Sequence, residues 1–205
     1  MIEIIGSGKH SGVVEDSLSK KKVKYLNLSK KFINKSDSKL EKIISKNKKV
    51  YHLHIAIGDN KLRERVYDYF KKKKYKFATI IDPTSIVSKN AKVGKGTYIG
   101  PGTIVNNNAK VANNCIINSG SIIEHDVNIK CSSHLAPGSK VMGSTVVGKR
   151  CFIGAGSILN NNIKIINDCV IGSGSVVINN LKHKGLYAGI PAKKKKWQFI
   201  SPLLV

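Results

Sequence analysis

The sequence predicts an α/β domain built on a parallel sheet at residues 1–80, followed by a parallel β-helix at residues 81–205. In the first part of the 205-residue chain, short apolar runs alternate with segments of helical periodicity, which is typical of strands and helices around a parallel sheet. In the second part, an aliphatic residue recurs at every sixth position from Ile81 to Val177. A six-residue period indicates a β-helix, since an α-helix repeats every 3.6 residues and a plain strand every two.

The repeat also predicts how each coil is built. The recurring aliphatic side chain points inward, and a mostly small residue four positions later fits where the wall turns. Three units close one triangular coil, so residues 18 apart stack at about the 4.8 Å spacing of neighbouring strands. One such column consists of Cys115, Ser133, Cys151 and Cys169. We therefore interpret these cysteines as packing residues, without disulfides.

The first part contains four predicted strands, at residues 2–5, 22–28, 51–57 and 75–81, with helices beginning near Ser11 and spanning 38–44 and 61–74. Ligands of such sheets bind at the carboxyl ends of the strands. That rule selects two loops, at residues 6–11 and 58–60. The glycine turn of the first loop opens a helix, whose backbone N–H groups can face a phosphate. It is neither a P-loop nor a full dinucleotide fingerprint, so a tight turn without a ligand stays an alternative.

The net charge of +24 suggests nucleic acid as a partner, but the distribution of that charge argues against it. Nearly all the basic residues are lysines spread over the chain, with only Arg63, Arg65 and Arg150 available for bidentate recognition. We interpret them as a solvated surface that can attract anionic substrates such as nucleotides and coenzyme phosphates. The longest apolar runs are far shorter than a membrane span, and no signal peptide is recognisable, so we expect a cytoplasmic protein.

Four residues that could carry chemistry interrupt the Ser, Asn, Gly and Ile of the repeat, namely Glu124, His125, Asp126 and His134. A histidine, with its ordinary pKa near 6.5, is the usual general base for a nucleophile that must lose a proton. A carboxylate on the far ring nitrogen would fix its tautomer. Adjacent side chains on a strand point opposite ways, so Asp126 can reach His125 only if the chain turns there, and Glu124 is the fallback. The alternative is a structural role, in which the hydrogen bonds of His125 are simply satisfied at a corner of the coil and the residue has no part in catalysis.

Four segments carry a resemblance to a known family: GSGKHSG, IAIGDN, IIEHD…SSHLAPGS and the final YAGIPAK. Together they resemble the left-handed β-helix acyltransferases with hexapeptide repeats. The subfamily contains sialic acid O-acetyltransferases and UDP-4-amino-sugar N-acetyltransferases of bacterial surface glycan or glycoprotein biosynthesis. The resemblance implies a Rossmann-like N-terminal acceptor-binding domain, a homotrimer, acetyl-CoA as donor, His125 as base and Asp126 as its partner.

The resemblance also assigns residues to the two substrates. Coenzyme A would lie between two β-helices and contact His134, Gly143, Ala155, Ser173 and Lys193. The sugar or nucleotide-sugar acceptor would contact Gly6, Gly8, His10, Gly58 and Asp59. One departure concerns the acidic residues that nucleotide-sugar members carry after the second strand, where this chain has Asn27 and lysines. That departure leaves open a nucleotide other than uridine, or a free sugar.

The leading hypothesis is therefore direct acetyl transfer to the amine of a nucleotide-linked 4-amino sugar. The alternatives are O-acetylation of a sialic acid hydroxyl and a non-catalytic β-helix scaffold. A β-helix hydratase of the carbonic anhydrase type would need three metal histidines, whereas only His125 and His134 lie in the repeat. We expect no metal.

Overall fold

The computed structural model describes residues 2–6, 9–18, 23–26 and 52–196 of the chain. Its N-terminal part contains a parallel sheet of order β2-β1-β3, formed by β1 (Ile2–Ile5), β2 (Val23–Leu26) and β3 (His52–Ile55). Among the described residues, the helices α1 (Lys9–Asp16) and α4 (Asn60–Lys72) accompany it. The helix predicted at 38–44 lies outside the described residues.

The fourth strand predicted for this sheet, at residues 75–81, is wrong. Phe77 makes a single parallel bridge to Leu53 of β3, and the chain then leaves the sheet. Ile80 and Ile81 form β4, which pairs with β7 (Tyr98–Ile99) of the β-helix; the Ile80 N–H donates to the Thr97 carbonyl at 2.9 Å. The hexapeptide period therefore begins to set strand pairing at Ile80. The domain boundary after residue 80 stays a prediction.

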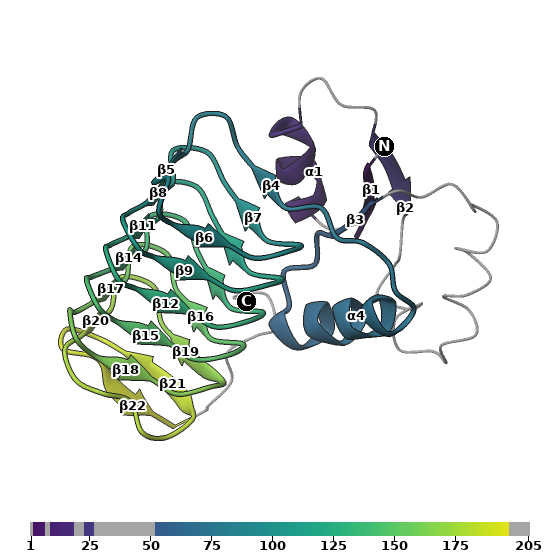
Figure 1. Cartoon of the computed structure of the whole chain (residues 1–205). Helices are drawn as coiled ribbons and strands as arrows, with labels where there is room; N and C mark the ends of the chain where they lie inside the picture. The colour runs from purple at the N-terminus through teal and green to yellow at the C-terminus, as the bar shows by residue number, and fades with distance from the viewer. Residues whose placement is uncertain (1, 7–8, 19–22, 27–51, 197–205) are drawn as a thin grey trace.

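The β-helix has the predicted triangular cross-section, with three parallel sheets as its sides (Figure 1). The eight-stranded sheet consists of β4 (Ile80–Ile81), β7 (Tyr98–Ile99), β10 (Ile116–Ile117), β13 (His134–Leu135), β16 (Phe152–Ile153), β19 (Cys169–Ile171), β21 (Gly185–Ala188) and the antiparallel β22 (Lys193–Lys195). The six-stranded sheet consists of β5 (Ile86–Val87), β8 (Ile104–Val105), β11 (Ile122–Ile123), β14 (Lys140–Val141), β17 (Ile158–Leu159) and β20 (Val176–Val177). The five-stranded sheet consists of β6 (Lys92–Val93), β9 (Lys110–Val111), β12 (Asn128–Ile129), β15 (Val146–Val147) and β18 (Lys164–Ile165).

The six-residue anchors fill the interior as predicted. Ile123 and Leu135 are fully buried, and strands pair in register with those 18 residues away, as Ile123 does with Val141. Several of the small residues form hydrogen bonds with backbone groups at the corners. The Ser133 hydroxyl, for example, donates to the Gly148 carbonyl at 2.7 Å and accepts from the Cys151 N–H at 3.1 Å. The first anchor is an exception. Ile81 is 44% exposed because β4 is the end strand of its sheet.

The N-terminal part packs beside the first coils of the β-helix (Figure 1). The outward side chains of Tyr98 and Ile116 on the eight-stranded sheet join a buried cluster with Ile4, Val14 and Ala56. The two other sheets present different outer surfaces. Outward positions of the six-stranded sheet are Ile86, Ile104, Ile122, Lys140, Ile158 and Val176. Those of the five-stranded sheet are Lys92, Lys110, Asn128, Val146 and Lys164.

The four cysteines are free, and Cys115, Cys151 and Cys169 are buried as packing residues. No helix among the described residues is long and apolar enough to cross a membrane.

Candidate functional site

His125 and Asp126 form a hydrogen-bonded pair at the corner between the six-stranded and five-stranded sheets, which we call the His125 corner. Asp126 adopts a left-handed backbone conformation with φ of 60°, and this turn brings its carboxylate back to the preceding residue. His125 Nδ1 and Asp126 Oδ2 are 2.9 Å apart. The hydrogen bond from His125, followed by one from Asn108, lowers the pKa of Asp126. The turn on which the carboxylate contact depends is therefore present.

Gly143 lies one coil above His125 and leaves room for the imidazole. A Cβ at this glycine would sit 2.7 Å from His125 Nε2, closer than a carbon can approach without displacing the ring. The Ser144 N–H donates to the His125 carbonyl at 3.0 Å, which fixes the stacking of the two coils. The glycine therefore allows the free ring nitrogen to lie over the backbone of the next coil.

Glu124 does not compete for the ring in this arrangement. Its N–H donates to the Val141 carbonyl at 3.0 Å, and its carboxylate makes no hydrogen bond to any described residue. Of the two acids that flank His125, Asp126 is the one in contact with it.

His134 lies on the opposite side of the prism, where the eight-stranded sheet faces the N-terminal part. Its ring packs edge-on against Phe152, with centroids 5.1 Å apart, and lies 6.4 Å from the ring of His10. Both ring nitrogens are enclosed and lack hydrogen-bond partners among the described residues. Burial, followed by the positive charge of Arg63 and the proximity of a second titratable ring at His10, lowers the pKa of His134 to about 3. Because the eight-stranded sheet is opposite the His125 corner, the two histidines do not meet within one chain.

Arg63 of α4 was not predicted as a site residue. Its fully buried guanidinium donates to the carbonyls of Asn114 and Ser132 at 3.0 and 2.8 Å, and to those of Ile57 and Gly58 at 2.9 and 3.0 Å. Burial lowers its pKa to about 10. One side chain thus joins the 57–60 loop to the β-helix. The only signal in the sequence was that a predicted helix of this lysine-rich chain carries arginine, at two positions, Arg63 and Arg65.

The predicted acceptor residues gather near this junction. Gly6 has a φ of 149°, and a Cβ there would lie 2.5 Å from the Ala56 carbonyl oxygen. His10 packs against Tyr98, with centroids 5.3 Å apart, and burial followed by the charges of His54 and Arg63 lowers its pKa to about 3. Asp59 caps α4 by accepting from the Leu62 N–H at 2.7 Å. Gly58 has open space around its α-carbon. Gly8 lies outside the described residues.

A cavity of about 470 Å³ opens beside this loop. It is lined by both parts of the chain, namely by Asp59, Asn60, Lys61, Arg150, Phe152, Asp168, Val170, Lys184 and Gly185. Arg150 is fully paired there, with two bonds of 2.7 Å to Asp168 and one of 2.8 Å to Glu64. Since Phe152 also contacts His134, the cavity adjoins the buried histidine pair.

The predicted donor residues divide between two corners. Gly143 belongs to the His125 corner, whereas Ala155 and Ser173 stack on the corner between the eight-stranded and six-stranded sheets, which we call the Ala155 corner. The Gly174 N–H donates to the Ala155 carbonyl at 2.8 Å. The 189–192 loop continues this stack, since the Gly189 N–H donates to Ser175 Oγ at 3.2 Å. Lys193 follows that loop and is exposed. The six-stranded sheet separates the two corners.

Known proteins match both parts of the chain. The family model of the PglD N-terminal domain matches residues 1–70, and the model of the bacterial transferase hexapeptide matches residues 90–125. No curated relative matches the sequence. The fold and these two matches make the chain similar to hexapeptide-repeat transferases that carry a PglD-type N-terminal domain.

Solved structures narrow the class. PerB from Caulobacter crescentus, a perosamine N-acetyltransferase solved with CoA and GDP-perosamine, is 29% identical with a TM-score of 0.86, over 95% of this chain and 97% of that one. The acetyltransferase domain of PglB from Neisseria gonorrhoeae, with acetyl coenzyme A, shares the fold at 22% identity and a TM-score of 0.84, over 95% and 98% of the chains. WeeI from Acinetobacter baumannii does so at 18% identity and 0.82, over 95% and 99%. In fold and sequence the chain is similar to hexapeptide-repeat sugar acetyltransferases.

Proposed function

We propose that this protein transfers the acetyl group of acetyl-CoA to the amine of a nucleotide-linked 4-amino sugar, in the cytoplasm, where we expect the protein to reside. The observation that carries the proposal is the His125–Asp126 pair on a rigid corner of a hexapeptide β-helix. The likeness to an enzyme solved with CoA and GDP-perosamine supports both substrates. It also fits the missing acidic residues after β2, since the nucleotide of that enzyme is not a uridine nucleotide.

The chemistry needs one base and no covalent enzyme intermediate. The sugar amine attacks the thioester carbonyl, forming the C–N bond as the C–S bond breaks, and the thiolate leaves as coenzyme A. His125 Nε2 takes the proton that the nitrogen loses, a contribution of about 10²–10⁴-fold. Asp126 accepts from Nδ1, which keeps Nε2 free and stabilises the imidazolium.

Asp126, and not Glu124, is the supporting acid in this proposal. Asp126→Asn suits the left-handed backbone at this position, because asparagine tolerates it nearly as well. We expect kcat to fall about tenfold or more, since the neutral amide stabilises the imidazolium less. Glu124→Gln is the matched control, and we expect its kcat to stay near that of the unaltered protein. The reverse pattern would assign the role to Glu124.

A homotrimer would complete the site. If three chains pack through the six-stranded sheet around a threefold axis, the two edges of each sheet meet the edges of its neighbours. The His125 corner of one chain then faces the Ala155 corner of the next. His125 and Gly143 of one subunit and Ala155, Ser173, Lys193 and the nearby His134 of its neighbour would line one groove for acetyl-CoA.

The outer surface of the six-stranded sheet supports this packing. Its outward side chains are aliphatic in five of the six strands, and Ile86 is 67% exposed. An apolar strip that is interrupted by Lys140 alone, on a chain that is otherwise rich in lysine, is typical of a protein interface. Ile122→Lys places a charge in its middle and should give a monomer in light scattering, with loss of activity. An active monomer would contradict the trimer.

Mixing two inactive variants tests whether the site is shared. His125→Ala removes the base, and Ala155→Arg should block the donor groove at the other corner. Co-assembled subunits contain some interfaces with an intact His125 corner facing an intact Ala155 corner, about a quarter of them at equal mixing. We expect activity to return to that fraction on co-assembly. No recovery in verified mixed trimers would place both corners in the site of one chain.

The function itself is tested with acceptor panels. The purified protein with acetyl-CoA should add one acetyl group, seen by mass spectrometry, to a GDP-linked or other nucleotide-linked 4-amino sugar. Free sialic acid in the same panel tests the O-acetylation alternative. Absence of acetyl-CoA binding in calorimetry would favour a non-catalytic scaffold.

A further inference from the structure

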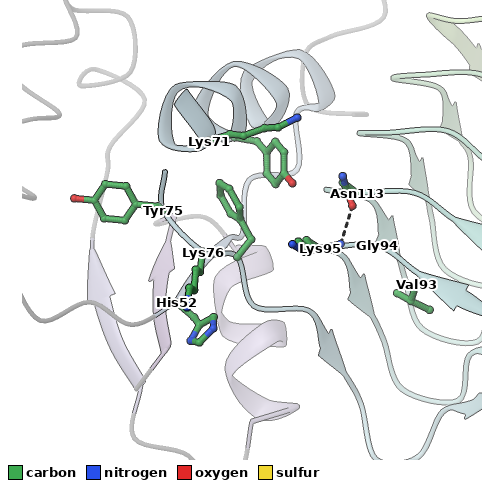
Figure 2. A pocket seen from close by; sticks show the side chains of 10 residues that line it. His52, Lys71, Tyr75, Lys76, Val93, Gly94, Lys95 and Asn113 are labelled. Carbon is green, nitrogen blue, oxygen red and sulfur yellow. Dashed lines mark hydrogen bonds between the residues drawn. The ribbon is translucent and has the colours of Figure 1, made fainter. Parts of the chain in front are cut away.

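A second cavity lies at the opposite end of the N-terminal strands from the predicted acceptor loops. Its volume is about 680 Å³, within the range of small-molecule sites. His52, which opens β3, lines it, whereas Gly58 and Asp59 follow the carboxyl end of that strand. The other walls come from α4, from residues 75–77 after it, and from the first coils of the β-helix at 93–95 and 113 (Figure 2).

The charged groups around this cavity all have one sign. Lys71 comes from α4, Lys76 from the segment after it, and Lys95 from the β-helix. All three are exposed, and none forms an ion pair with another described residue. Among the described residues, no carboxylate lines the cavity. Three ammonium groups and the His52 imidazole around one hollow favour an anion there.

The remaining wall is apolar and rigid. Tyr67 and Phe77 stack with ring centroids 4.1 Å apart, and Val93 lies on the β-helix side. The Asn113 side-chain oxygen accepts from the Lys95 N–H at 2.8 Å, which holds the corner under Lys95 (Figure 2). Its amide NH₂ group is a further donor. A hollow with cations on its rim and an apolar floor suits an organic molecule that carries phosphate.

We propose that this cavity binds a phosphorylated small molecule, with its phosphate held by Lys71, Lys76 and Lys95 and its organic part against Tyr67 and Phe77. The site is separate from the two catalytic corners. Because α4 and the β-helix each supply part of it, a bound ligand would tie the N-terminal part to the first coils. The shared chemistry is a phosphate group, which a nucleotide and a free polyphosphate both offer.

Residue-level protection of lysines tests the proposal without interference from the acceptor site. The full-length protein is acylated with an amine-reactive ester in the presence of GDP, inorganic pyrophosphate or guanosine, and each lysine is quantified by mass spectrometry. We expect GDP to reduce labelling of Lys71, Lys76 and Lys95 several-fold, with Lys110 unchanged. Protection by pyrophosphate as well would show that phosphate alone suffices. Equal protection by guanosine, or none by either phosphate compound, would overturn the proposal.

A charge-matched pair of variants gives a second readout. Lys71→Gln with Lys95→Gln removes two cations from the cavity. Lys72→Gln with Lys110→Gln removes two exposed cations that do not line it. We expect the first pair to lose protection of Lys76 and to bind pyrophosphate about tenfold or more weakly, since charge-assisted hydrogen bonds to phosphate are lost. Equal pyrophosphate binding by both pairs of variants would refute the site. Because all four lysines are exposed, we expect both double variants to fold.

Discussion

His125 and His134 lie nine residues apart in sequence, yet the structure gives them opposite environments. His125 stands on a corner with its side chain 61% exposed and its Nδ1 held by Asp126. His134 has both ring nitrogens enclosed, no hydrogen-bond partner among the described residues, and a pKa lowered to about 3. The ring of His125 is accessible to a substrate, whereas His134 is held as a neutral ring.

The difference shows that local structure determines the environment of His125, whereas tertiary packing determines that of His134. The His125 pair is local, because one left-handed residue turns the carboxylate onto the ring. The environment of His134 is tertiary, because it exists only when α1, α4 and the 57–60 loop cover the eight-stranded sheet. Substitutions at the corner should therefore alter catalysis without altering stability. Changes at the junction should alter stability first.

The largest expected effect is loss of the base. His125→Ala should lower kcat by about 10²–10⁴-fold while the unfolding transition stays in place, because the side chain is exposed. Steady-state kinetics and thermal unfolding measure the two quantities. Asn107→Ala, which is exposed on the same corner one coil below, is the control and should keep its activity. Normal turnover by the histidine variant would contradict the proposed base.

Arg63→Met tests the junction. Removing the guanidinium leaves several buried carbonyls without a donor, which we expect to cost about 3–5 kcal/mol of unfolding free energy. Denaturant titration measures it. Arg65→Met, on the exposed side of the same helix, should change stability by less than about 0.5 kcal/mol. Equal effects would show that Arg63 is not the link between the two parts.

Gly143→Ala separates positioning from stability. The added Cβ would push the His125 ring off its place, and a displacement near 1 Å can cost about 10²-fold in rate. We expect the loss in kcat, with unchanged unfolding. Gly12→Ala, which has nothing within 4 Å of its would-be Cβ, serves as the control. An unimpaired Gly143 variant would show that the ring can relocate without consequence.

The last expected effect, gradual because it is spread over several pH units, is a slope in the pH dependence of stability. In the unfolded chain His134 has a pKa near 6.5, whereas in the folded chain its pKa is about 3. The stability tied to this group is therefore complete above pH 6.5 and is lost as the pH falls. His134→Phe should reduce the slope of unfolding free energy between pH 6.5 and 4 by about 1.4 kcal/mol per pH unit. The exposed His183 is the control, and an equal change in its Phe variant would contradict the assignment.

Much of the fold could be predicted because the repeat specifies it locally. Each aliphatic anchor had a predicted inward position, and Ile123, Leu135 and Val141 are all fully buried. The alternation of strand and helix identified β1, α1, β3 and α4. The error at residues 75–81 arose because the same aliphatic run fits a strand of either sheet. Only pairing with β7 decides which sheet it joins.

The candidate site could be predicted less completely. His125 and its two acids stood out because acidic residues are rare in the repeat. Whether Asp126 could reach the ring depended on one φ angle, which side-chain periodicity does not specify. Arg63 was missed because its partners are main-chain carbonyls from distant segments, and carbonyls have no sequence signature.

By itself the sequence determined the β-helix, the inward anchors and the residues available for chemistry, because a strict period of six leaves one way to bury an apolar side chain on every turn. The tertiary structure decided which side of the prism each of those residues occupies. It assigned His125 and Gly143 to one corner, Ala155 and Ser173 to another, and His134 to a buried junction. The physical reason is that a prism has three sides, and which of them the N-terminal part covers depends on contacts between segments far apart in the chain.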